Sequence, residues 1–280
     1  MDETVVRLAE KAWSLYTPLD GSQRLLLAIA GIPGSGKTTF ASLIAAELNK
    51  RRRTSFHADH PNSPTSGSNG QPDLAYVVPL DGYHLTRAQL AALPDSEEAI
   101  FRRGAAFTFD GESYLSLVRR LRQPIEATTT TIHAPSFDHE VKDPVENDIP
   151  IPPSARIIIF EGLYLALSRP PWSEAADLMD EIWFMDVPLP VAEARVAKRN
   201  FAAGLSPSLD KAMARTRQSD MRNARDVLEN RINGIAELVG SVEDEAWKSQ
   251  AVENVEKEQQ AREDEERAKV KMVSCAFPWG

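Results

Sequence analysis

Eight consecutive residues, Gly31 to Thr38, match the pattern G-x-x-x-x-G-K-[ST] at every fixed position. Glycines let successive backbone N–H groups approach phosphate oxygens, because no Cβ atom stands in the way. Lys37 would reach the β- and γ-phosphates of a nucleoside triphosphate, and the Thr38 hydroxyl would bind Mg²⁺. The pattern therefore predicts a phosphate-binding loop. Its candidate residues are Gly31, Pro33, Gly34, Ser35, Gly36, Lys37, Thr38 and Thr39.

Two acidic residues follow apolar runs that we predict to be strands. Asp81 follows residues 74–80, and Glu161 follows residues 156–160. In parallel α/β sheets, ligands bind beyond the carboxyl ends of the strands. Asp81 is therefore a candidate general base toward an attacking hydroxyl, or a water-mediated Mg²⁺ contact; the structural alternative is an N-cap for a helix near Thr86. Glu161 has the position of a Walker-B acid, which helps to hold Mg²⁺ or orients the nucleophile.

A predicted helix that ends at Gly204 carries Arg195, Lys198 and Arg199 on neighbouring turns. In a mobile pair of helices over the phosphate loop, such residues would neutralise charge on a transferred phosphoryl group. A solvated basic face is the structural alternative. Because a phosphate loop and two strand-end acids precede this segment, we expect a helical lid over residues 189–220.

Short apolar runs and apolar residues at helical spacing alternate along the chain. This pattern predicts an α/β fold, in which helices flank a core of parallel β-strands. Residues 128–153, where β-prone threonines precede several prolines, are expected to form a hairpin outside the main sheet. Strands are expected over residues 25–30, 74–80, 156–160 and 181–187, and helices over residues 4–16, 39–48, 86–93, 97–103 and 112–122.

The 280-residue chain has a net charge of −9, which argues against general nucleic-acid binding. Its single cysteine, Cys275, excludes a disulfide framework within one chain and suits a reducing compartment. The first residues lack the apolar core of a signal peptide, and no apolar run approaches membrane-spanning length. We therefore predict a soluble cytoplasmic protein with no membrane or nucleic-acid partner. The oligomeric state stays open, and a homodimer is one candidate.

Two segments have the composition of solvated chain. Residues 57–73 are rich in Pro, Ser, Asn and Gly, which predicts a flexible surface insertion. Most of residues 241–280 are charged residues, Gln and Ala, which predicts a charged helical tail. We therefore expect one domain over residues 1–240, followed by this tail.

The order of the motifs resembles the phosphoribulokinase/uridine kinase family of P-loop kinases, a family that also includes bacterial-type pantothenate kinase. The similar blocks span roughly residues 24–231 and are GIPGSGKTTF, PLDGYH, RRGAAFTFD, APSFDHE, IIIFEGLYL, RVAKRN and SDMRN. The resemblance implies a P-loop NTPase fold and a kinase domain. It also implies ATP and Mg²⁺ as cofactors and a small molecule with a hydroxyl group as the substrate.

The resemblance further implies a role for each matching position. Asp81 would be the general base, and the hairpin would hold the acceptor. The catalytic candidates are Asp81, Lys37, Glu161, Arg195 and Arg199, and the metal candidates are Thr38 and Glu161. The substrate-binding candidates are Asp81, Tyr83, His84, Arg102, Arg103, Asp110, Phe137, Asp138 and His139. Asp110 is also expected to cap the helix over residues 112–122, and Asp220 and Asn223 resemble a later D-x-x-N block of the family.

The acceptor stays open among a nucleoside, a pantothenate-like acid, glycerate and a sugar derivative. The chain has Phe137 where uridine kinases have Tyr, which counts against a nucleoside. Arg102 and Arg103 favour an anionic or heavily hydroxylated molecule.

We predict an ATP-dependent small-molecule kinase that transfers the γ-phosphoryl group of Mg-ATP to a hydroxyl of a metabolite. One alternative is a regulatory GTPase, which usually needs an N-K-x-D motif after a strand; the one N-K pair, Asn49-Lys50, lies at a helix end and continues into arginines. A second alternative is a nucleotide-binding scaffold with little turnover. The intact set of catalytic candidates favours the kinase over both.

Overall fold

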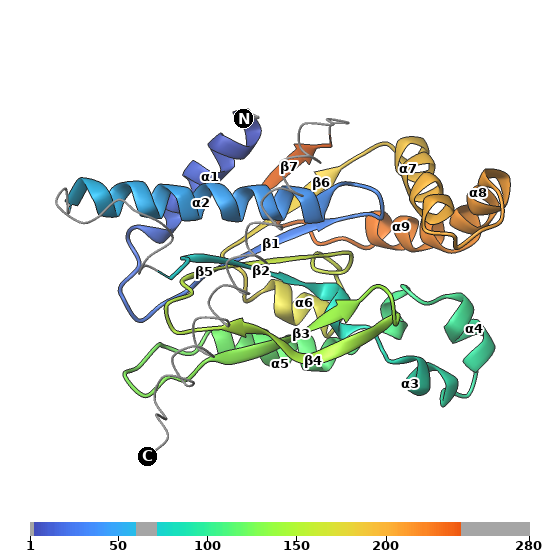
Figure 1. Cartoon of the computed structure of the whole chain (residues 1–280), viewed down its shortest axis with the longest axis horizontal. Helices are drawn as coiled ribbons and strands as arrows, with labels where there is room; N and C mark the ends of the chain where they lie inside the picture. The colour runs from blue at the N-terminus through green and yellow to red at the C-terminus, as the bar shows by residue number, and fades with distance from the viewer. Residues whose placement is uncertain (1–2, 60–71, 242–280) are drawn as a thin grey trace, which may run out of the picture.

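The computed structural model of the chain describes residues 3–59 and 72–241 (Figure 1). Most of the predicted insertion over residues 57–73, and nearly all of the predicted tail over residues 241–280, lie outside these ranges. At its start the insertion differs from the prediction, because the helix that follows the phosphate loop continues to Asp59. None of the helices in the described ranges has both the length and the apolar character of a membrane-spanning segment.

Parallel strands form the central sheet, in the order β2-β5-β1-β6-β7. The central strands β1 and β5 are buried along their whole length, which explains why their sequences are continuous apolar runs. No sequence pattern predicts β7, because this strand is short and mostly accessible to solvent. The strands are β1 (Leu25–Gly31), β2 (Ala75–Pro79), β5 (Ile157–Gly162), β6 (Glu181–Asp186) and β7 (Glu237–Gly240).

Helices cover both faces of this sheet (Figure 1). Alternate residues of β1 belong to two separate hydrophobic cores, because successive strand side chains point to opposite faces. Leu27 lies in the core shared with α1 (Glu3–Tyr16) and α2 (Lys37–Asp59). Ala28 lies in the core shared with α5 (Gly111–Leu121) and α6 (Trp172–Ala176). The predicted α/β fold with a parallel sheet between helices is therefore confirmed.

Three helices follow β6 and lie beyond the carboxyl end of the sheet (Figure 1). They are α7 (Leu189–Ala202), α8 (Leu209–Gln218) and α9 (Asp220–Glu229). After α7 ends, Gly204 adopts a left-handed φ of 69°, a conformation that glycine reaches without strain. The segment that we predict to form a lid is thus helical. A bidentate ion pair between Asp226 of α9 and Arg169 fastens α9 to the loop before α6.

The segment after β2 packs against a hairpin outside the main sheet. The hairpin has the predicted location, and its strands are β3 (Ile132–Asp138) and β4 (Asp143–Ile151), with an irregular register between Ala134 and Ser136. The 3₁₀ turn η1 (Leu80–Tyr83) lies directly against β3, and a Cβ atom added to Gly82 would come within 2.1 Å of the Pro135 carbonyl oxygen. Three short helical elements follow: α3 (Arg87–Ala91), α4 (Ser96–Phe101) and η2 (Ala106–Thr108).

The contact at Gly82 generates a prediction about stability. Gly82→Ala should lower the free energy of unfolding by about 2 kcal/mol, because the new methyl group must push the hairpin backbone away from η1. Gly21→Ala is the matched control, since nothing lies within 4 Å of a Cβ atom at that glycine. Urea denaturation of both variants measures the difference. Equal stabilities of the two variants would contradict the close packing.

Candidate active site

The phosphate loop connects β1 to α2, as the motif predicts. Gly34 and Gly36 adopt left-handed φ values of 77° and 87°, so a side chain at either position would strain the loop. The loop is also closed in by α7, since a Cβ atom on Gly34 would lie 2.8 Å from the Ala192 carbonyl oxygen. The N-terminus of α2 follows at once. Its unpaired N–H groups and the loop amides form the kind of cradle that binds phosphate.

Lys37, Glu161 and Asp81 share one electrostatic environment at the carboxyl end of β2 and β5. Pro79 lies opposite Glu161 in the register of these strands, so Asp81 follows close behind. Burial lowers the pKa of Lys37, while the negative charges of Glu161 and Asp81 act in the opposite direction. Burial raises the pKa of Glu161 to about 7, opposed by Lys37 and by a hydrogen bond with Thr38. Three of the predicted catalytic residues thus lie together.

The donors around Glu161 fit a divalent cation that also binds nucleotide phosphates. The Glu161 Oε2 atom is buried and has no hydrogen-bond partner within the described chain, which is costly unless a ligand or water satisfies it. The Thr38 side chain lies beside the same carboxylate. No group of three His, Cys, Asp or Glu side chains in the described ranges could hold a metal ion alone. A cation at Thr38 and Glu161 would therefore depend on phosphate oxygens for further ligands.

The two predicted lid arginines differ in their surroundings. Arg195 donates from Nη1 to the Gly34 carbonyl oxygen at 3.3 Å and to Ser241 Oγ at 2.7 Å. Ser241 in turn donates to the Ser35 carbonyl oxygen at 2.7 Å. Arg195 therefore braces the phosphate loop from α7. Arg199 is exposed, and its positive charge reaches Lys37 and helps to lower the pKa of that lysine.

Ser241 is a site residue that no sequence motif indicates. It follows the short strand β7, and its backbone N–H donates to the Asp186 carbonyl oxygen at the end of β6. Only the pairing of β7 with β6 carries the chain back to the phosphate loop. Ser241 could have been found from the sequence only if the strand β7 had been predicted.

Aromatic rings surround His84 beside the candidate base. Its ring centroid lies 3.9 Å from that of Phe109 and 5.0 Å from that of Phe137. Nδ1 is 2.8 Å from the backbone oxygen of Asp81 and 4.0 Å from its carboxylate. Burial lowers the pKa of His84, which favours the neutral ring, although the charge of Asp81 opposes the change. The Asp81 side chain is half exposed, and the helix α3 is capped by Thr86 instead. The capping alternative for Asp81 is therefore wrong.

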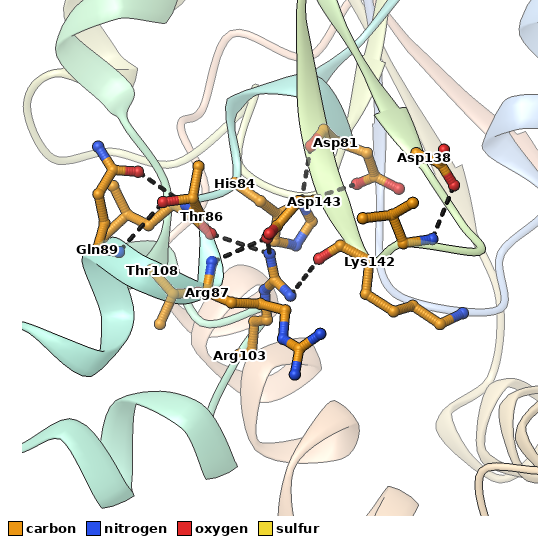
Figure 2. A network of polar contacts seen from close by, with 12 residues as sticks. Asp81, His84, Thr86, Arg87, Gln89, Arg103, Thr108, Asp138, Lys142 and Asp143 are labelled. Atoms are coloured by element: carbon orange, nitrogen blue, oxygen red, sulfur yellow. Dashed lines mark hydrogen bonds and ion pairs between the residues drawn. The ribbon is translucent and has the colours of Figure 1, made fainter.

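Arg103, which we predict to bind substrate, instead joins the β3–β4 hairpin to the segment after β2 (Figure 2). It donates to the backbone oxygens of Lys142 and Leu85 and, at 3.0 Å, to the Asp143 carboxylate. The guanidinium also lies 5.5 Å from the centre of the Phe137 ring. The arginine thus fixes Phe137 over His84 and is engaged by protein groups on several sides.

The remaining substrate-binding candidates fall into two groups. Tyr83 is buried against Tyr114, Asp110 caps α5 by accepting from Ser113, and Asp138 accepts two backbone N–H groups of the hairpin turn. These three side chains are therefore engaged in packing or capping within the protein. Asp81, His84 and Phe137 converge on one place, and the exposed His139 lies beside Phe137. Arg102 is buried, and together with Phe109 it lines a separate cavity that is described below.

The raised pKa of Glu161 generates a prediction about pH. The folded protein holds this proton up to about pH 7, and the unfolded chain releases it near pH 4.5. Its stabilising effect is therefore complete below pH 4.5 and is lost as the pH rises through 7. Glu161→Gln should gain about 2 kcal/mol of stability relative to the wild type between pH 5 and pH 8.

Thermal or urea unfolding at several pH values tests this expectation. Glu97→Gln, on the exposed face of α4, is the control and should follow the wild type at every pH. A difference between Glu161→Gln and the wild type that stays constant with pH would show that Glu161 is not destabilised by burial.

Comparisons with known proteins agree with this geometry. No model of a protein family matches the chain. The chain is 38% identical over 214 residues to a uridine kinase-like protein of Schizosaccharomyces pombe, a match that covers 76% of this chain and 82% of that protein. It is 54% identical over 153 residues to the ATP-dependent kinase-like protein notR′ of Aspergillus versicolor, which covers 55% of this chain and 89% of that protein.

A solved structure shows the same fold. The crystal structure of YFH7 from Saccharomyces cerevisiae, a candidate P-loop kinase with a circular permutation, superposes with a TM-score of 0.72. The match covers 85% of this chain and 99% of that chain at 23% identity. The parallel sheet, the glycine loop and the helices around them therefore form a P-loop NTPase fold, as the sequence predicts.

Proposed function

Because the chain belongs to the phosphoribulokinase/uridine kinase family of P-loop kinases, we propose that it transfers the γ-phosphoryl group of ATP to a hydroxyl of a small metabolite. The observation that carries this proposal is the shared environment of Lys37, Glu161 and Asp81. A phosphate-binding lysine and a half-exposed carboxylate meet there, next to a wall of aromatic rings. A regulatory GTPase does not need such an aromatic surface beside its nucleotide site.

The proposed reaction is an in-line displacement. Asp81 accepts the proton of the acceptor hydroxyl, the acceptor oxygen bonds to the γ-phosphorus, and the bond to the β-phosphate oxygen breaks to release ADP. Lys37 and the loop amides bind the phosphates and stabilise the charge that develops on them. Arg199 adds positive charge from α7. Arg195 acts as a positioning residue, since it holds the loop backbone in place.

Thr38 and Glu161 are the residues that would hold Mg²⁺. When bound, the ion neutralises charge on the β- and γ-phosphate oxygens. The buried, unpaired Oε2 atom of Glu161 and the neighbouring Thr38 hydroxyl support this assignment. We propose a cytoplasmic kinase domain over residues 1–240, and sedimentation of the purified protein distinguishes a monomer from a homodimer.

The direct test is ADP release from Mg-ATP against a panel of hydroxylated metabolites. An acceptor should stimulate release, and Asp81→Asn should reduce the stimulated rate by about 10²- to 10⁴-fold, because the amide cannot take the proton. Asp177→Asn, an exposed carboxylate after α6, is the matched control and should keep the wild-type rate.

Two results would contradict the proposal. If no metabolite stimulates ADP release, a nucleotide-binding scaffold with little turnover becomes the better account. If an acceptor stimulates release equally in the wild type and in Asp81→Asn, phosphoryl transfer occurs but Asp81 is not the base. Direct detection of the phosphorylated product separates the second result from simple ATP hydrolysis.

A further inference from the structure

A cavity of about 910 Å³ lies beside the candidate active site. Its walls come from the segment around Phe109, the loop before α6, and α9, and they include the side chains of Arg102 and Trp172. Its size is within the range of pockets that bind metabolites. The residues that line it do not include Lys37 or Asp81, so this cavity is not the nucleotide site.

Two stacked aromatic rings, those of Phe109 and His84, separate the cavity from the candidate base. Phe109 lines the cavity, where its ring centroid is 6.3 Å from that of Trp172. The same ring lies 3.9 Å from the His84 ring. His84 is itself 4.0 Å from the Asp81 carboxylate. A molecule seated against Phe109 and Trp172 therefore lies across the Phe109–His84 pair from Asp81, and an extended molecule has to pass around this pair to bring a hydroxyl to Asp81.

Arg102 carries a buried positive charge that the protein leaves poorly compensated. The residue is 7% exposed. Its closest hydrogen-bond partner is a neutral amide, Asn223 Oδ1, at 2.8 Å. The carboxylate of Glu98 lies 3.7 Å away, but 54% of that side chain is exposed to solvent. The Nε atom has no hydrogen-bond partner in the described part of the chain. A buried charge of this kind is costly unless a counter-ion meets it.

The other charges of the cavity supply that counter-ion only in part. The charge of Asp226 acts on Arg102, but this carboxylate is held by Arg169 in a bidentate ion pair, and Asp110 is engaged in capping α5. The exposed charges on the rim balance one another in number and are screened by water; they are Glu112, Glu229, Arg222 and Arg225. Arg222 also shares Glu98 with Arg102, at 3.8 Å. The buried guanidinium is thus the charge that remains for a ligand.

We infer that this cavity holds the phosphate acceptor, and that the acceptor carries an anionic group, carboxylate or phosphate, which pairs with Arg102. The inference rests on the proposed kinase function and narrows its substrate to hydroxylated acids or phosphate esters. Phe109 and Trp172 pack against the body of the molecule. Its reacting hydroxyl extends around Phe109 and His84 toward Asp81.

Matched pairs of compounds that differ mainly in the anionic group test the inference. The pairs are D-glycerate and glycerol, pantothenate and pantothenol, and ribose 5-phosphate and ribose. Binding is followed by tryptophan fluorescence, with Trp172→Phe to show which signal comes from the cavity. ADP release is measured separately. At least one anionic member should bind, and its neutral partner should bind at least tenfold more weakly; the carboxylate and phosphate arms distinguish the two kinds of anion.

Variants of Arg102 and of its hydrogen-bond partner Asn223 provide a second test of the inference. Arg102→Gln should lower the affinity for the anionic compound to that for its neutral partner, and Arg102→Lys should retain part of the difference in affinity. Because a buried arginine can be needed for folding, Asn223→Asp is tested as well. It keeps the guanidinium but supplies an internal counter-ion, so it too should abolish the preference. Arg119→Gln, an exposed arginine of α5 paired with Glu174, is the control.

Each outcome decides a different claim. Equal binding of charged and neutral partners, a preference that survives in Asn223→Asp, or no response to any of the three anions would overturn the inference. Efficient phosphoryl transfer to a neutral member would leave the kinase proposal intact and also overturn the inference. Anion-selective binding that depends on Arg102, without any ADP release, would support the cavity and contradict the kinase proposal.

Discussion

Burial of Lys37 and Glu161 at the carboxyl end of a parallel sheet is the constraint on which the site depends. Each charge would be costly alone, and burial shifts both pKa values toward the neutral form. They are tolerated because their opposite charges attract one another, because Asp81 stabilises the charge of Lys37, and because Thr38 forms a hydrogen bond with Glu161; the charge of Asp81 itself adds to the raised pKa of Glu161. The remaining cost is offset by the burial of apolar side chains on the neighbouring strands, which helices cover on both faces.

The aromatic cluster beside Asp81 is held at the same edge of the sheet by a different interaction. Arg103 ties the β3–β4 hairpin to the turn after β2, and this bond holds Phe137 over His84. The rings of His84 and Phe109 stack on one another. A continuous series of aromatic rings therefore runs from the hairpin, past Asp81, to the cavity; the rings are those of Phe137, His84, Phe109 and Trp172. The phosphate loop and the aromatic cluster therefore both lie near Asp81 but are positioned by separate elements.

Much of this arrangement could be predicted, because local sequence encodes it. The glycine loop, the apolar strands and the strand-end acids Asp81 and Glu161 follow from motif and periodicity. Long-range contacts could not be predicted in the same way. Whether Arg103 binds substrate or the hairpin depends on Asp143, which lies on β4, and the role of Ser241 depends on β7 pairing with β6. The sequence alone does not assign the roles of Asp110 and Asp138 for a related reason, since a carboxylate that can bind a ligand can equally cap a helix or a turn.

Isothermal titration of Mg-ATP tests the central claim that the buried lysine of this loop makes the nucleotide site. The wild type is compared with Lys37→Met and with Lys50→Met, an exposed lysine of the same helix α2. The account predicts that Lys37→Met weakens binding at least tenfold, which corresponds to about 1.4 kcal/mol, while Lys50→Met binds as the wild type does. Equal affinity of all three proteins for Mg-ATP would contradict the account, because the charge at Lys37 would then serve no bound phosphate.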